Sequence, residues 1–271
     1  MKQTIKSIIP APLWNFARNT NDAIRRLPQL PAAYLHPWRR ESIRRLAALK
    51  DIHKGKRAFI IGNGPSLKQT DLTKLKNEFT FGMNRFYMAF PELGFTTTYF
   101  CSINDLVIEQ FSDDILALPM PTFLAWRSHR HFSPQLPISK IPTFVYTSYT
   151  GPRMADDVTG RVWEGATVTN FAIQIAFHMG FEKVVLIGVD HNFASKGDAN
   201  KTVVSEGDDP NHFMPNYFGK GVKWQLPDLD TSEVGYIMAR EAYRKAGREI
   251  VDATVGGKLT VFPKVDYNSL F

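Results

Sequence analysis

The chain has little of what defines several common protein classes. Its single cysteine, Cys101, excludes an intramolecular disulfide and a zinc site built from several cysteines. It contains no apolar run near the roughly 18–20 residues of a membrane span, and no hydrophobic segment typical of a secretory signal. These absences predict a cytoplasmic protein, and 271 residues suffice for one large α/β domain with an appendage.

Acidic residues are scarce at the beginning of the chain. Residues 1–50 hold ten Lys and Arg against Asp22 and Glu41, a balance of +8, whereas the whole chain carries +7, so the other 221 residues sum to −1. We therefore predict that residues 1–56 form a basic, amphipathic helical arm in which aromatic residues such as Trp14 and Trp38 stand among arginines. This mixture suits an anionic membrane surface, here the inner face of the membrane. Packing on the chain's own domain, or on a second subunit of a homo-oligomer, is an equal alternative. No segment resembles a nucleic-acid recognition fold, so we expect no nucleic-acid partner.

Two glycine-rich nucleotide motifs are also absent. A strand-like run at Arg57–Ile61 leads into the turn Gly-Asn-Gly-Pro-Ser, but Leu67 stands where the dinucleotide fingerprint needs its third glycine, and no P-loop Lys-Ser/Thr pair follows. Glycine permits positive φ and close approach of a ligand, and the first amides of a helix attract anions. The alternative is an ordinary strand-to-helix turn. We predict a nucleotide site of another kind, built from Gly62, Asn63, Gly64 and Ser66.

Runs of β-forming residues alternate with helical patterns along the rest of the chain. This alternation predicts an α/β fold over residues 57–271, with a doubly wound, mostly parallel, Rossmann-like sheet. The expected strands are 57–61, 79–83, 97–103, 122–126, 144–146, 183–190 and 249–253, and the expected helices are 39–53, 71–76, 105–117, 167–181 and 231–246.

Residues 191–230 interrupt this rhythm. The segment is polar and rich in Gly, Pro, Asn and Asp, without a periodic apolar pattern. Long segments of this kind in compact domains are usually binding loops or lids. We therefore predict a lid over residues 191–230.

Polar side chains follow four of the expected strands. Three of them are asparagines in corresponding positions. In open parallel sheets, ligands bind outside the carboxyl ends of the strands, and neutral amides can recognise a sugar or a pyrimidine without adding charge. Each asparagine alone could equally be a turn or cap residue. Together they predict a ligand site at Asn63, Asn84, Asn104, Asp105 and Asp190.

The lid also carries a candidate base. His212 lies among turn-forming residues, with Asn211, Tyr217 and Phe218 close in sequence. An imidazole in a cleft suits general-base chemistry near neutral pH. His191, next to Asp190, could instead bind phosphate or a metal.

The sequence resembles two known groups of proteins. Residues 60–67 (Ile-Ile-Gly-Asn-Gly-Pro-Ser-Leu) with 84–87 (Asn-Arg-Phe-Tyr) look like the opening of the bacterial sialyltransferases of glycosyltransferase family 42, and the segment 165–190 resembles their helix and Gly-Ile-Asp strand end. Residues 57–263 also resemble the wider family of 6-hydroxymethylpterin diphosphokinase-like proteins, through 209–212, 217–219 and 256–259. Residues 1–56 lie outside both resemblances.

The sialyltransferase resemblance implies a GT-A-like variant of the fold and an inverting, metal-independent transfer of a sialic-acid-like sugar from a CMP-activated donor to a glycan or lipid-linked acceptor. It implies that Asn63, Asn84 and Asn104 contact the donor, and that His212 deprotonates the acceptor. It also implies that Tyr217 supports the leaving phosphate, and that no resident cofactor or metal is needed. A serine of those enzymes corresponds loosely to Val168, so Thr167 or Thr169 would replace it.

The second resemblance implies a different reaction. Pyrophosphoryl transfer from ATP to a pterin alcohol would need Mg²⁺, held by Asp105, Asp190 or Asp209. That chemistry requires carboxylates around a cation, whereas the strand ends are rich in asparagine, which favours glycosyl transfer. A nucleotide-binding regulatory module without catalysis is a third hypothesis.

Overall fold

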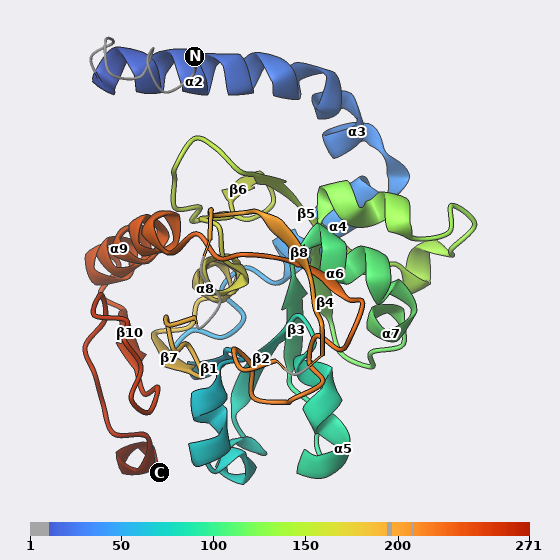
Figure 1. Cartoon of the computed structure of the whole chain (residues 1–271). Coiled ribbons are helices and arrows are strands. Elements are labelled where there is room, and N and C mark those ends of the chain that lie inside the picture. The colour runs from blue at the N-terminus through green and yellow to red at the C-terminus, as the bar shows by residue number, and fades with distance from the viewer. Residues whose placement is uncertain (1–10, 194–196, 208) are drawn as a thin grey trace.

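The computed structural model describes residues 11–193, 197–207 and 209–271 (Figure 1). These residues form an eight-stranded sheet in the order β10-β7-β1-β2-β3-β4-β5-β6, in which every pair of neighbours is parallel. The strands are β1 (Arg57–Ile61), β2 (Phe79–Met83), β3 (Tyr99–Ser102), β4 (Thr122–Ala125), β5 (Thr143–Ser148), β6 (Arg161–Trp163), β7 (Lys183–Ile187) and β10 (Glu249–Asp252). The predicted mostly parallel, Rossmann-like α/β fold is confirmed.

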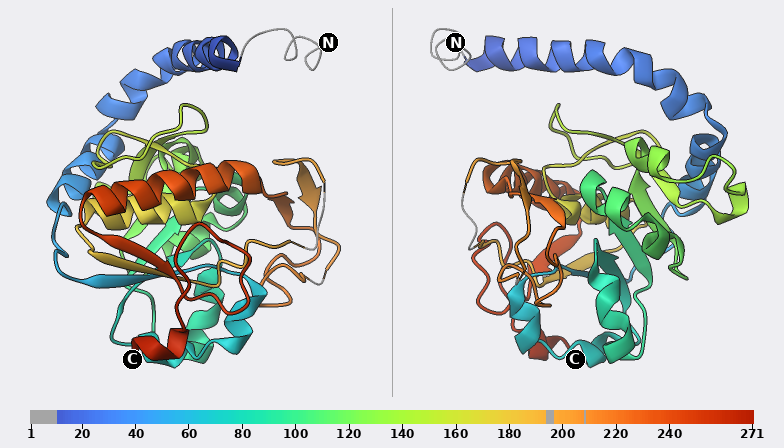
Figure 2. Two further views of the ribbon diagram at one scale, coloured as in Figure 1. Left: turned by 90° about the vertical axis from the view of Figure 1, so that its left-hand side faces the viewer. Right: turned by 45° about the vertical axis from the view of Figure 1, so that its right-hand side comes forward.

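The sheet is accompanied by helices, which lie on both of its faces with the exception of α2 (Figure 2). They are α2 (Ala11–Arg26), α3 (Leu30–Leu35), α4 (Pro37–Ala48), α5 (Phe90–Leu93), α6 (Asp105–Gln110), α7 (Ser112–Leu116), α8 (Val168–His178) and α9 (Leu229–Lys245), with 3₁₀ helices η1 (Leu27–Gln29), η2 (Pro65–Gln69), η3 (Leu72–Leu75), η4 (Phe86–Ala89), η5 (Trp126–His131), η6 (Ile138–Lys140) and η7 (Tyr267–Leu270).

The strands are apolar on both sides because both faces of the sheet are covered. In β1, Ala58 and Ile60 pack with α8 and α9 in one hydrophobic cluster, while Phe59 and Ile61 pack with η2, η3 and η4 in another. This double burial is typical of parallel sheets. It explains why continuous apolar runs, rather than alternating ones, marked these strands in the sequence.

The order of the strands fixes where a ligand would bind. The chain leaves β1 toward β2 on one side, and β7 is hydrogen-bonded to β1 on the other, with Ile61 opposite Ile187. The direction of winding therefore reverses between β1 and β7. In doubly wound sheets, such a reversal opens a crevice at the carboxyl ends of the strands.

Several boundaries differ from the sequence predictions. The expected helix 105–117 is divided into α6 and α7 at Phe111, and β6 was not predicted. The helix expected after β1 is η2, a 3₁₀ helix of five residues. The lid, in which no strand was predicted, contains the antiparallel pair β8 (Thr202–Val204) and β9 (Lys223–Gln225). Its apolar residues Tyr217, Phe218 and Trp224 pack on Val107 of α6, which fixes part of the lid to the body.

The basic arm divides into two parts. Helix α4 belongs to the body, because Leu46 joins the core cluster of the sheet and the Ser42 hydroxyl accepts a hydrogen bond from the Phe144 amide at 2.9 Å. By contrast, α2 stands clear of the body in both views of Figure 2. Ala33 of α3 also packs in a core cluster with Phe144, so the arm predicted as residues 1–56 is integrated into the domain from α3 onward. Its residues 1–10 and the side chain of Trp14 lie outside the described part. No helix in the described residues is long and apolar enough to cross a membrane.

Candidate active site

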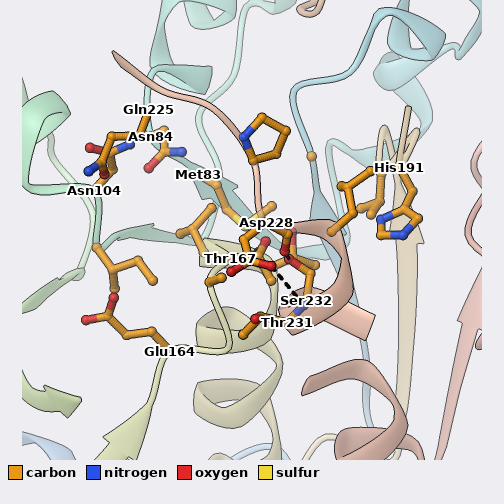
Figure 3. Close-up of a pocket in the computed structure, with 18 of the residues that line it drawn as sticks. Met83, Asn84, Asn104, Glu164, Thr167, His191, Gln225, Asp228, Thr231 and Ser232 are labelled. Atoms are coloured by element: carbon orange, nitrogen blue, oxygen red, sulfur yellow. Dashed lines mark hydrogen bonds between the residues drawn. The ribbon is translucent and has the colours of Figure 1, made fainter. Parts of the chain in front are cut away.

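A cavity of about 840 Å³ lies at the carboxyl ends of the strands, where β1 and β7 separate. Strand ends, the first turns of α8 and α9, and lid residues contribute to its wall (Figure 3). The structure brings most of the predicted site residues to this cavity: Gly62, Asn63, Gly64, Asn84, Asn104, Asp105, Thr167, Asp190 and His212 line it. Ser66 and Tyr217 do not belong to the lining.

The turn after β1 already binds a carboxylate of the same chain. Asp190, which follows β7, accepts hydrogen bonds from the Ser66 amide at 3.1 Å and from the Ser66 hydroxyl at 2.6 Å. A Cβ atom on Gly64 would lie 1.8 Å from the Asp190 carboxylate, and one on Gly62 would lie 2.1 Å from the Gly188 carbonyl oxygen. The glycines are therefore required by the close approach of the segment after β7.

This arrangement corrects the predicted anion site at the turn. We expected free amides at the start of a helix, but an internal carboxylate already binds there, and η2 is too short to develop an appreciable dipole. Gly64 also has φ of −70°, so it does not need the left-handed conformation. Ser66 is buried and holds Asp190, so the structure gives it a place in the scaffold of the cavity wall.

The three asparagines each use part of their side chain to hold the strand ends. Asn63 donates its amide to the Met83 carbonyl at 3.0 Å, which ties the end of β1 to the end of β2. Asn84 has φ of 52° and accepts a hydrogen bond from Ser102 at 3.0 Å. Asn104 caps α6 by accepting from the Leu106 and Val107 amides. Among the described residues, no hydrogen bond is donated by the side-chain amide of Asn84 or Asn104, so both donors can serve a ligand. Figure 3 shows Asn84, Asn104 and Gln225 on one side of the cavity and His191 on the other.

The lid positions His212 together with a carboxylate. The Nδ1 atom of His212 lies 2.7 Å from an Asp209 carboxylate oxygen, and both side chains are mostly buried, with 13% and 5% of their surfaces exposed. Because Asp209 is only three residues away and also accepts from the Asn211 amide at 3.0 Å, the turn itself fixes the pair. With Nδ1 engaged, Nε2 is the nitrogen that can take a proton from a substrate in the cavity. Asp209 was predicted only as a magnesium ligand.

The ring of Tyr217 packs against the ring of His212. The two rings are stacked with centroids 4.0 Å apart and an interplanar angle of 8°. Tyr217 is fully buried, its hydroxyl accepts a hydrogen bond from the Arg85 amide at 3.1 Å, and burial raises the pKa of that hydroxyl. The structure thus directs the Tyr217 hydroxyl toward the backbone at the end of β2, and not toward a phosphate in the cavity.

A chain of ion pairs forms a further wall. Arg127 pairs with Glu164 and also binds the Thr147 hydroxyl at 2.9 Å. Burial favours the neutral form of Asp105, but hydrogen bonds from Ser128 and His131 and the charge of Arg130 outweigh it and lower the pKa of Asp105. Each charge in this wall already has an internal partner. These residues therefore shape the cavity and are less suited to carrying a proton.

Positive helix ends also face the cavity. Thr167 caps α8 by accepting from the Thr169 amide at 3.2 Å, and Asp228 caps α9 by accepting from the Thr231 amide at 3.0 Å. The first residues of both helices are part of the lining. Because the cap of α8 is neutral whereas that of α9 is a carboxylate, the α8 end is the more favourable position for an anion.

Next to these helix ends lies a second histidine paired with a carboxylate. Nε2 of His191 is 2.9 Å from the Glu233 carboxylate of α9, and His191 has φ of 53°. His191 lines the cavity. Its position next to Asp190, at the end of the expected strand 183–190, was the sequence signal, but its partner on α9 could not be found from the sequence.

The carboxylates considered for magnesium are engaged separately. Asp105 binds Ser128 and His131, Asp190 binds Ser66, and Asp209 binds His212. Within the described ranges, no group of three or more His, Cys, Asp or Glu side chains is arranged to hold a metal ion.

Comparison with known proteins places the chain in a family. No curated protein matches it. Among solved structures, it is similar to the MAf glycosyltransferase from Magnetospirillum magneticum AMB-1, with a TM-score of 0.44 and 18% identity over 90% of this chain and 40% of that one. The chain therefore spans about two fifths of the length of that glycosyltransferase. A family model described as 6-hydroxymethylpterin diphosphokinase MptE-like matches residues 39–196, more than half of the sequence. The chain belongs to the 6-hydroxymethylpterin diphosphokinase MptE-like family.

Proposed function

We propose that the protein is a glycosyltransferase that moves a sialic-acid-like sugar from a CMP-activated donor to a hydroxyl of a glycan or lipid-linked acceptor. The observation that carries this proposal is the His212–Asp209 pair at the wall of the cavity. A histidine whose second nitrogen is held by a carboxylate is suited to removing a proton from a hydroxyl. The resemblance of the strand-end motifs to sialyltransferases supplies the donor class.

The proposed reaction is a single displacement. The acceptor oxygen forms a bond to the anomeric carbon while the bond from that carbon to the donor phosphate oxygen breaks. The acceptor proton goes to Nε2 of His212, and the phosphate leaves with the electron pair as CMP. Asp209 stabilises the imidazolium that forms, because its carboxylate lies 2.7 Å from Nδ1. Attack from the side opposite the leaving group inverts the anomeric configuration.

The departing phosphate needs stabilisation that Tyr217 is not placed to give. The neutral cap at the start of α8 and the His191 imidazole both belong to the cavity wall. A protonated His191 would be stabilised by Glu233 and could meet the developing negative charge. Asn84 and Asn104, on the other side, have amide donors for the nucleotide or sugar. This division of roles requires no metal ion in the transfer step.

A magnesium-dependent pyrophosphoryl transfer is the second candidate, because the family to which the chain belongs is described as 6-hydroxymethylpterin diphosphokinase MptE-like. In that case ATP and Mg²⁺ would bind near Asp105 and Asp190. The separate engagement of these carboxylates makes this candidate secondary, since they would have to exchange protein partners for the ion.

A nucleotide panel separates the two functions. Thermal unfolding of the purified full chain is measured with CMP, a CMP-sialic acid or ATP. Each nucleotide is tested once with excess Mg²⁺ and once with EDTA. We expect the CMP compounds to stabilise the protein equally in both conditions, by roughly 2.7 kcal/mol at a hundredfold excess over Kd. Incubation of the stabilising donor with acceptors should then release CMP in EDTA. Stabilisation by ATP with Mg²⁺ alone would replace the glycosyltransferase proposal with the diphosphokinase one.

A further inference from the structure

We propose that α2 and the following η1 form an anionic-lipid-binding segment that attaches the body to a membrane surface. This inference does not depend on the reaction that the cavity performs. Phe16, Ile24 and Leu27 are 70%, 58% and 58% exposed, among the most exposed large apolar side chains of the described chain. Such exposure of several large apolar side chains along one helical segment is costly in water and indicates a surface that meets another partner.

These side chains share one face of the segment. In a helix, residues separated by three, four, seven or eleven positions stand above one another, and Phe16, Ala23, Ile24 and Leu27 follow that spacing. Arg25 is exposed on the other side of the helix. An apolar face backed by basic residues is the arrangement of helices that lie in the plane of a membrane interface.

The charge of the arm selects the partner. Residues 11–29, which form α2 and η1, hold Arg18, Arg25 and Arg26 against Asp22, a balance of +2, and Lys2 and Lys6 precede them in the sequence. An anionic lipid surface complements this charge and can also bury the apolar face. A second copy of the segment would bring two positively charged segments together, so charge opposes self-association through this face. Nucleic acid would match the charge but would leave Phe16, Ile24 and Leu27 in water.

The residues that follow α2 and η1 are packed on the sheet, so attachment of the segment to a membrane also attaches the body. Ala33 of α3 is fully buried, and the Tyr34 and Tyr146 rings contact each other with centroids 5.9 Å apart. Trp38, at the start of α4, stacks on Phe144 of β5 at 6.0 Å. The arm is therefore fixed to the sheet at one end, while α2 extends away from the body (Figure 2).

Vesicle binding tests the proposal. The full chain is sedimented with vesicles of phosphatidylcholine alone and of phosphatidylcholine mixed with phosphatidylglycerol. The variants are the triple substitution Phe16→Gln, Ile24→Gln, Leu27→Gln and, separately, Arg25→Gln. Glutamine retains helix propensity, so the arm keeps its conformation. The matched control is Ile52→Gln with Ile138→Gln, two side chains that are each 47% exposed outside the segment.

We expect binding to the anionic vesicles only, with the control equal to the unmodified protein and the triple variant weaker by tenfold or more, on the order of the loss of one buried apolar side chain. Arg25→Gln should weaken binding about fivefold, the effect of one charge near the surface. High salt should weaken it as well, since the Debye length falls to about 3 Å at 1 M.

Three results would overturn the proposal. The first is equal binding to neutral and anionic vesicles, and the second is binding that the triple variant retains. The third is a concentration-dependent dimer, detected by sedimentation without vesicles, that the triple variant abolishes while the protein ignores lipid. That last result would assign the face to a second copy of the chain.

Discussion

The turn after β1 and the lid differ in what their polar groups bind, and only the lid keeps the role that its sequence predicts. The turn has the glycine-rich pattern of a ligand site, yet its Ser66 amide and hydroxyl bind Asp190 of the same chain. The lid has no periodic pattern, yet it holds His212 between a carboxylate and a stacked aromatic ring. The lid thus holds a histidine–carboxylate pair in a fixed position, whereas the turn forms part of the cavity wall.

This difference has a physical origin. A glycine in the sequence indicates that another group approaches the backbone closely, but it does not show whether that group is a ligand or part of the same chain. At Gly64 the nearest group is the Asp190 carboxylate, brought there by the parallel pairing of β1 with β7. In the lid, by contrast, a short turn brings residues 209 and 212 together without help from distant strands.

Removing the carboxylate partner of the histidine should have the largest effect in this comparison. Asp209→Asn should lower turnover by about 10²-fold, because the neutral amide cannot stabilise the imidazolium that forms during transfer. Nucleotide binding and thermal stability should change little. Glu206→Gln, which removes an exposed lid carboxylate, is the control and should retain full turnover. Equal rates for both variants would show that Asp209 does not support the base.

Filling the turn should damage the fold. A Cβ on Gly64 would meet the Asp190 carboxylate at 1.8 Å, so Gly64→Ala should lower the free energy of unfolding by about 1–3 kcal/mol. Gly219→Ala is the matched control, since its new Cβ has no neighbour closer than 3.9 Å. Thermal unfolding measures both. A stable Gly64→Ala protein that no longer binds nucleotide would make the turn a ligand site after all.

Asn104 allows the scaffold and ligand roles of an amide to be separated. Asn104→Ala should lose the cap of α6, at about 1 kcal/mol of stability, whereas Asn104→Ser should keep it. Both variants lose the amide donor, so each should bind nucleotide about three- to tenfold more weakly, the effect of one hydrogen bond. If Asn104→Ser binds nucleotide as tightly as the unmodified protein, Asn104 acts only as a cap.

The smallest effect is expected at Tyr217. Tyr217→Phe removes the acceptor of the Arg85 amide and should cost about 1 kcal/mol of stability, while the stacked ring stays in place. Turnover measured at saturating donor should change by less than about threefold, a difference too small for a lost transition-state contact. A large loss of turnover in a stable variant would show instead that the Tyr217 hydroxyl supports the leaving phosphate.

The sheet could be predicted well because its determinants are local. The apolar runs at 57–61 and 79–83 reflect burial on both faces, and their boundaries appear in the structure unchanged, whereas the expected strand 183–190 ends three residues earlier, at Ile187. Elements that depend on tertiary contacts were harder to predict. The division of helix 105–117 at Phe111 and the three-residue strand β6 have no periodic signal in their own residues.

The site could be located but not fully assigned. Parallel strands end at one edge, so Asn63, Asn84 and Asn104 were expected at a common cavity, and all three line it. The partners of the functional groups are a different matter. Glu233 reaches His191 from α9, forty-two positions away, and a single sequence contains no record of that contact. Asp209 lies near His212, but its carboxylate could equally have been a metal ligand by composition alone.

The central claim is that His212 takes the proton of the acceptor, and single-turnover transfer by His212→Ala tests it most directly. The variant is loaded with the CMP-activated donor in EDTA, donor affinity is measured, and acceptor is then added. The account predicts unchanged donor affinity and transfer slower by about 10²–10⁴-fold, the usual contribution of a positioned base. Transfer at the rate of the unmodified protein, or a rate that vanishes in EDTA before any substitution, would contradict it.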